Sequence, residues 1–147
     1  METGAILKTL REKRGLTQDR LAERMMVTRQ AVSRWESGAT LPGPDTLKLL
    51  SREFGVSINT ILGSPRQLWC QCCGMPLSED GLISREPDGS FNEDYCRWCY
   101  ADGRFAYERK EDLIAFLLAH MPDPEGRPEE ERRQALDRLL SGLKHWS

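Results

Sequence analysis

Short amphipathic segments separated by turn residues fill the first 62 positions of the chain. Apolar residues recur at the three- and four-residue spacing that places them on one face of a helix. Glycines or side chains suited to capping bound most of the segments. The pattern predicts five short helices: 5–14, 18–24, one from Thr28 to Glu36, 46–54, and one capped by Ser57 that ends near Leu62.

The pattern changes after residue 63, where a short linker is predicted over 64–68. Residues 69–100 are poor in helix, and the apolar positions on either side of Pro87-Asp88-Gly89 predict a small β-hairpin. Helical stripes return over 108–120 and again after Pro128. We therefore expect a mainly α chain with two domains: five helices over 1–63, and a module over 69–147 with a short hairpin and two C-terminal helices.

Composition and charge favour a soluble protein with two different halves. Charged residues make up 30% of the 147, and no apolar run approaches the roughly 20 residues of a membrane span. No secretory signal is evident, so we expect a cytoplasmic protein without membrane contact, whose thiols stay reduced. Residues 1–63 hold ten Lys and Arg against seven Asp and Glu, whereas residues 64–147 hold eleven against sixteen. A positive first half and an acidic second half are typical of a DNA-binding domain joined to a second part that does not contact DNA.

Two Cys-x-x-Cys pairs, Cys70/Cys73 and Cys96/Cys99, lie 22 residues apart. Each pair offers two sulfurs from one tight turn, so together they supply the four ligands of a tetrahedral zinc ion. Four thiolates leave no position for a catalytic water, which predicts structural zinc. A disulfide-bonded extracellular domain is the disfavoured alternative. The sequence offers no catalytic constellation, so we expect no enzyme.

The remaining candidate ligands fall outside this spacing. Cys72 is interpreted as a bystander, with the alternative that it exchanges as a ligand or becomes oxidised. His120 and His145 are isolated in the sequence, so ordinary surface positions are expected for them.

The third predicted helix carries polar side chains suited to reading DNA. Arg29, Gln30, Ser33 and Arg34 lie opposite the apolar Ala31 and Val32. Arginine can form paired hydrogen bonds with guanine, and glutamine can do so with adenine. The alternative is an ordinary solvated helix face.

The stretch Leu16-Thr17-Gln18…Leu21-Ala22…Val27-Thr28-Arg29-Gln30-Ala31-Val32-Ser33-Arg34-Trp35-Glu36-Ser37-Gly38 resembles the phage-repressor and Cro-like (XRE-type) helix-turn-helix family of bacterial regulators. The resemblance covers residues 5–62. It implies that Arg29, Gln30 and Arg34 meet base edges, that Gln18 meets a phosphate, and that Arg11 and Glu36 form a bracing ion pair. Thr28 is either a helix cap or a phosphate contact, and Ser33 touches bases or backbone. Met26 stands where that family often has glycine.

The segments Cys70–Leu77 and Tyr95–Phe105 resemble a small bacterial zinc-ribbon family, and the likeness continues to Leu143-Lys144-His145-Trp146. It places the four ligand positions on Cys70, Cys73, Cys96 and Cys99.

The main hypothesis is a transcriptional regulator that binds double-stranded DNA as a homodimer and contains structural zinc. The dimer contact is assigned to the apolar side chains of the tail, which alternatively pack within the module: Leu136, Leu139, Leu140, Leu143 and Trp146. One competing hypothesis is an adaptor that binds a protein partner through the C-terminal half. The other is a metal- or redox-responsive regulator.

Overall fold

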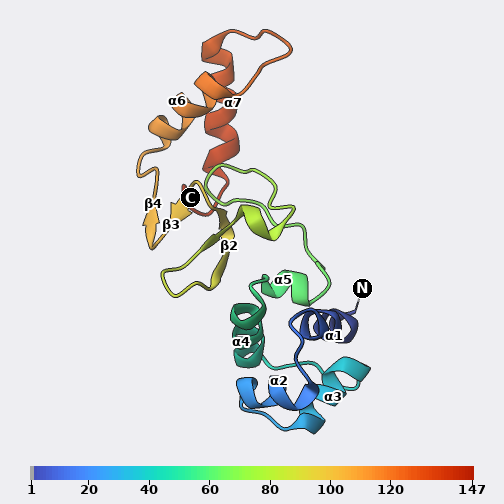
Figure 1. Cartoon of the computed structure of the whole chain (residues 1–147). Coiled ribbons are helices and arrows are strands. Elements are labelled where there is room, and N and C mark those ends of the chain that lie inside the picture. The colour runs from blue at the N-terminus through green and yellow to red at the C-terminus, as the bar shows by residue number, and fades with distance from the viewer. Residues whose placement is uncertain (1) are drawn as a thin grey trace. The chain divides into compact units, whose positions relative to one another are not determined.

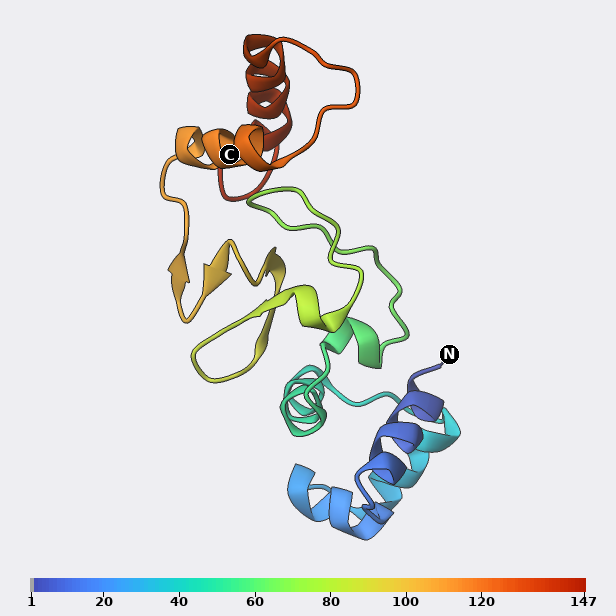
Figure 2. The ribbon, with the colours of Figure 1, turned by 45° about the horizontal axis from the view of Figure 1, so that its top comes forward.

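A computed structural model describes residues 2–147 and divides the chain into two compact units. The first comprises the residues up to Arg66 together with Gly89–Phe91, and the second comprises Gln67–Asp88 and Asn92–Ser147. The step from Arg66 to Gln67 falls inside the stretch 64–68 predicted as a linker. Figure 1 and Figure 2 show the order of the elements along the chain.

The first unit contains the five predicted helices. They are α1 Thr3–Lys13, α2 Gln18–Met25, α3 Arg29–Ser37, α4 Pro44–Phe54 and α5 Ile58–Ile61. The predicted start of α4 was two residues late, because Pro44 occupies the first helical turn instead of the preceding loop. Proline suits that position, since its fixed φ is helical and its missing N–H has no partner to lose.

Side-chain caps and left-handed residues set the limits of these helices. The hydroxyls of Thr17, Thr28 and Ser57 accept from the amides of the third residues beyond them, at 3.1, 3.2 and 3.1 Å. Gly38 ends α3 with a φ of 83°. Met26 ends α2 in the same left-handed region, with a φ of 57°. The turn before α3 therefore forms without the glycine that the resembled family often has there.

The core of the first unit consists of apolar side chains from all five helices. Leu7, Leu21, Val32, Leu50 and Ile61 are completely buried. Helix α1 approaches the end of α3 so closely that a Cβ on Gly4 would lie 2.5 Å from the carbonyl oxygen of Trp35. Gly4 is thus required by backbone packing, and this packing sets the position of α3 relative to α1.

The second unit combines two small sheets with two helices. Strands β1 Ile83–Arg85 and β2 Phe91–Cys96 form the predicted hairpin, preceded by a 3-10 turn at Asp80–Leu82. Strands β3 Tyr100–Ala101 and β4 Arg104–Phe105 form an unpredicted antiparallel pair. Asp102 and Gly103 join these strands with φ values of 54° and 79°. Positive φ at both positions is typical of a tight hairpin turn with the sequence Asp-Gly. This dipeptide is therefore a local signal for the second hairpin.

Two helices and a short tail complete this unit. They are α6 Lys110–His120 and α7 Glu129–Ser141, which pack on each other. Pro128 is the N-cap residue of α7, which begins directly after it. Among residues 2–147 we find no helix with the length and apolar character that crossing a membrane requires.

The tail folds back onto the strands and corrects one prediction. The imidazole of His145 stacks on Phe105 with ring centroids 4.1 Å apart, and its Nε2 lies 3.0 Å from the carbonyl oxygen of Tyr107. The expected ordinary surface position is therefore wrong for His145, whose ring joins an aromatic cluster. His120 is exposed, as expected, and its ring stacks on Phe116.

The tail residues considered for a dimer contact differ in exposure. Leu140 is completely buried, Leu143 lies against Gly74, and the indole of Trp146 donates to a backbone carbonyl. These three side chains pack within the module, which was the alternative interpretation. Leu139 is 60% exposed.

Candidate nucleic-acid interface and metal centre

Helix α3 has one buried face and one exposed polar face. Val32 and Trp35 are buried in the core of the first unit. All five residues predicted to contact DNA from this helix or its cap are exposed: Thr28, Arg29, Gln30, Ser33 and Arg34. The exposed face thus offers two guanidinium groups, an amide and two hydroxyls to any molecule that docks against it.

Two arginines are predicted to read bases, and one of them, Arg29, forms an ion pair within the part of the chain that the structure describes. Its Nε lies 3.9 Å from Oδ1 of Asp19, and the two side chains are 65% and 71% exposed. Exposed pairs of this length contribute about 0–1 kcal/mol. Arg29 can therefore leave Asp19 for another acceptor at little cost.

A partly buried ion pair joins α1 to the last turn of α3. Arg11 donates from Nε to Oε2 of Glu36 at 2.8 Å and from Nη2 to Oε1 at 3.0 Å. Its Nη1 donates to the carbonyl oxygen of Leu16 at 2.8 Å. Hydrogen bonding to Glu36 raises the pKa of Arg11 above its ordinary value. The ion pair implied by the family resemblance is confirmed, and it joins α1, the turn before α2, and α3.

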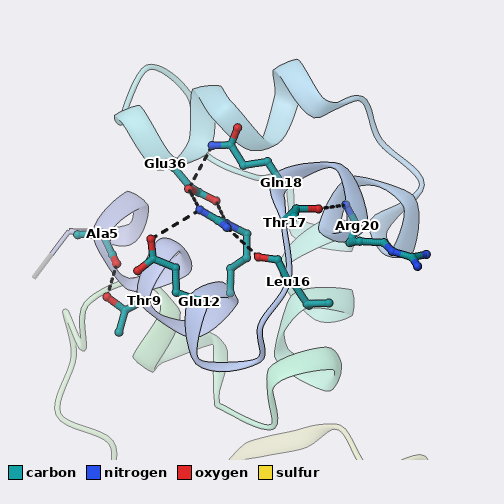
Figure 3. A network of polar contacts seen from close by, with 9 residues as sticks. Ala5, Thr9, Glu12, Leu16, Thr17, Gln18, Arg20 and Glu36 are labelled. Atoms are coloured by element: carbon teal, nitrogen blue, oxygen red, sulfur yellow. Dashed lines mark hydrogen bonds and ion pairs between the residues drawn. The ribbon is translucent and has the colours of Figure 1, made fainter.

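Gln18 is attached to the same carboxylate (Figure 3). Its Nε2 donates to Oε1 of Glu36 at 3.3 Å. A carboxylate can only accept, so this bond fixes which end of the amide faces inward. The second N–H of Nε2 remains for another acceptor. Periodicity along the chain does not predict this contact, because residues 18 and 36 belong to different helices.

The four paired cysteines form one cluster in the second unit. The sulfurs of Cys70, Cys73, Cys96 and Cys99 all lie within 4.8 Å of one another, and three of these residues are buried. The sulfurs of Cys73 and Cys96 are 3.9 Å apart. Cys72 is completely buried but lies outside this group of four.

Mutual hydrogen bonding perturbs the acidity of the clustered thiols. The pKa of Cys70 is lowered, chiefly by its hydrogen bond with Cys73. The pKa of Cys99 is raised, chiefly by its hydrogen bond with Cys70. Thiols this close cannot all ionise unless a cation neutralises them. The set therefore has the chemistry of a tetrahedral thiolate site, for which zinc is the usual ion.

Backbone amides support the cluster on one side. The N–H groups of Cys72 and Cys73 point at the sulfur of Cys70, at 3.4 and 3.5 Å. Gly74 follows with a φ of 82° and donates its amide to the carbonyl oxygen of Cys70 at 2.9 Å. A glycine at this position allows the left-handed backbone that the turn requires. Amide donors stabilise the ionised sulfur that a metal requires.

Comparison with known proteins agrees with this division of the chain. Residues 7–61 match the sequence family described as "Helix-turn-helix", and residues 69–147 match the family described as "Putative zinc ribbon domain". The second match covers more than half of the chain, which therefore belongs to this zinc ribbon family and carries a helix-turn-helix domain of the XRE type ahead of it.

One curated relative resembles the first unit. The HTH-type transcriptional activator BcrR of Enterococcus faecalis is 44% identical over 62 residues, which are 42% of this chain and 30% of that protein. The chain thus spans less than a third of this relative. The likeness concerns the helix-turn-helix domain, while the family match of the second unit, with its four clustered cysteines, indicates structural zinc.

Proposed function

We propose that this protein is a transcriptional regulator that binds specific sites in double-stranded DNA through α3. Arg29, Gln30 and Arg34 are assigned to base edges, and Ser33 to a base or the backbone. The exposed polar face of α3 is the observation that carries the proposal. A helix of this kind enters the major groove, which is wide enough to admit it and displays a distinct pattern for each base pair.

Gln18 and Thr28 are assigned to the phosphates on either side of that groove. The amide of Gln18 has one N–H engaged by Glu36, which leaves the other to donate to a phosphate oxygen. The hydroxyl of Thr28 accepts from the amide of Ala31, so its own hydrogen is available as a donor. Both side chains can therefore keep their structural bonds while they contact DNA. Phosphate contacts fix the register of a protein on the duplex.

Selection of genomic fragments with the purified, zinc-loaded full chain tests this proposal. We expect enrichment of a common site, with affinity that falls steeply as salt increases. Arg34→Ala should weaken binding to that site by about 1–3 kcal/mol and relax the preference at one base pair. Lys8→Ala is the matched control, because it removes one exposed positive charge of α1, outside the α2–α3 surface. Fragments recovered without any shared site would contradict the assignment.

Cys70, Cys73, Cys96 and Cys99 are assigned as the ligands of a structural zinc ion. Their mutual distances and the amide donors around Cys70 support this assignment. Over residues 69–105 the large buried apolar side chains are Leu77, Ile83 and Tyr95, so a metal ion would contribute much of the free energy that folds this segment. Four sulfur ligands offer no open position, and on this ground we propose a binding protein instead of an enzyme.

Binding as a homodimer completes the proposal. Helix-turn-helix dimers cover two half-sites about one helical turn apart, and a palindromic selected site would reveal this arrangement. Among the tail residues considered, Leu139 has the most exposed apolar side chain. Leu139→Glu should convert a dimer into a monomer in light scattering of the free protein. A parent chain that is monomeric both free and on DNA would remove this part of the proposal.

A further inference from the structure

The C-terminal tail crosses the turn that holds the first cysteine pair. The backbone N–H of His145 donates to the carbonyl oxygen of Gln71 at 3.0 Å. The indole Nε1 of Trp146 donates to the carbonyl oxygen of Cys72 at 2.8 Å. Both acceptors belong to residues between the two cysteines of the pair, Cys70 and Cys73.

These two carbonyls belong to the same peptide groups as the amides that face the sulfur of Cys70. A peptide group is planar, so its C=O and N–H point in opposite directions and turn together. The carbonyl of Gln71 shares a plane with the N–H of Cys72, and the carbonyl of Cys72 shares one with the N–H of Cys73. The amides lie 3.4 and 3.5 Å from the Cys70 sulfur. Each plane is thus held by the tail on one side and faces the sulfur on the other.

Further contacts fix the tail in this position. Lys144 donates from its backbone N–H to Oε1 of Gln71 at 3.2 Å, and its Nζ lies 2.8 Å from Oδ2 of Asp94. The hydrogen bond with Asp94 raises the pKa of Lys144. Asp94 in turn accepts the backbone N–H of Gln71 on its own carbonyl oxygen, at 2.6 Å. The tail therefore contacts the turn through both backbone and side chains.

We propose that Trp146 is a positioning residue of the metal centre, which acts through the peptide group of Cys72 and Cys73 to orient an N–H group toward the sulfur of Cys70. The inference rests on the proposed assignment of Cys70 as a zinc ligand. An N–H donor withdraws charge from a thiolate and stabilises its ionised form. Groups that hydrogen-bond to a metal ligand, without contacting the metal, typically lower metal affinity about 10- to 100-fold when they are lost.

Trp146→Phe tests the role of the indole N–H, because phenylalanine keeps an aromatic ring and removes only the donor and part of the ring area. The matched control is Trp98→Phe. Trp98 lies between Cys96 and Cys99, its ring is 59% exposed, and Arg97 lies over it. The control therefore removes an indole that lies next to the cysteines in sequence but makes no such bond to the turn.

Zinc affinity is measured by competition with a chromophoric chelator, using the full chain. We expect affinity to fall about 10- to 100-fold for Trp146→Phe and to change less than about threefold for Trp98→Phe. Replacing zinc with Co²⁺ gives a second measurement, the sulfur-to-cobalt charge-transfer absorption. Loss of an N–H donor raises the energy of the sulfur electrons, so this band should move to longer wavelength in Trp146→Phe alone. A variant that is merely less well packed would lose affinity without this shift.

The possible results separate the inference from the proposal on which it rests. A parent chain that binds neither Zn²⁺ nor Co²⁺ through sulfur would refute the metal site itself. A parent chain that shows the four-sulfur cobalt spectrum, with Trp146→Phe equal to it in affinity and band position, would refute only the positioning role. Circular dichroism at saturating zinc identifies a variant that fails to fold, and removal of the Lys144 ammonium that binds Asp94, by Lys144→Met, then provides the test. That variant should lower zinc affinity in the same direction, and unchanged affinity would overturn the inference.

Discussion

Replacing Gly4 with alanine should loosen the packing of α1 against α3. The added Cβ would lie 2.5 Å from the carbonyl oxygen of Trp35 and 2.7 Å from that of Glu36, whereas ordinary contact begins at 3.4 Å. The helices must therefore separate by most of an ångström. Both opposing atoms are backbone oxygens in the last turn of α3, so they cannot rotate away as the end of a flexible side chain would.

The magnitude follows from two opposing contributions. Overpacking of a core costs about 1–3 kcal/mol, and the rigid backbone atoms place Gly4→Ala in the upper half of that range. Because Gly4 is the second residue of α1, alanine gains there at most the roughly 1 kcal/mol by which it exceeds glycine in a helix interior. The expected net loss of local stability is therefore about 1–2 kcal/mol.

Hydrogen exchange followed by mass spectrometry measures this loss within the first unit alone. Amides of α1 and α3 should exchange about 5- to 30-fold faster, which is the factor that corresponds to the expected free-energy loss. Gly142→Ala is the control, because Gly142 has a right-handed helical backbone and an added Cβ would meet its nearest atom at 3.8 Å. Slower exchange in Gly4→Ala than in the parent would show that propensity outweighs the close approach, and would refute this reasoning.

Three further changes test other parts of the account. Met26→Gly should raise the free energy of unfolding by about 1 kcal/mol in urea denaturation, since the exposed Met26 adopts a left-handed φ; no gain over Met26→Ala would contradict this. Arg11→Met alone should cost up to about 3–5 kcal/mol because it leaves the largely buried Glu36 carboxylate with only the amide of Gln18, while Arg11→Met/Glu36→Leu should cost clearly less; equal losses would argue against this reasoning. Chelation of zinc should accelerate amide exchange across residues 69–147 and leave α1–α5 unchanged; protected amides after verified metal removal would show that the metal is dispensable for folding.

The sequence predicted the helices of the first unit because periodicity and caps are local signals. Thr17, Thr28 and Ser57 each perform the capping role that their position before an apolar stripe indicates. The cysteine spacing likewise indicated which sulfurs would gather, since a tight turn fixes each pair. Helices α1 and α4 both begin two residues before their predicted starts, in α4 because Pro44 belongs to the first helical turn.

Contacts between residues far apart in the chain could not be predicted from its local patterns. The tail donates to Gln71 and Cys72 from more than 70 positions away, and no periodicity reports such a pairing. His145 looked isolated because its partners Phe105 and Tyr107 come together with it only in three dimensions. Gly4 falls outside the predicted helix 5–14, and its packing could not be predicted because its close neighbours are backbone atoms of another helix. The second hairpin is different, since Asp102-Gly103 is a local signal that favours a tight turn between two strands.

The central claim is that the exposed face of α3 reads base pairs, and a specificity profile tests it most directly. The affinity of the parent chain and of Arg29→Ala and Arg34→Ala would be measured against every single base-pair substitution of the selected site. The account predicts that each arginine variant loses preference at its own base pair and keeps the preferences elsewhere, while Lys8→Ala keeps the whole profile. Arginine variants whose profiles match that of the parent at every position would contradict it.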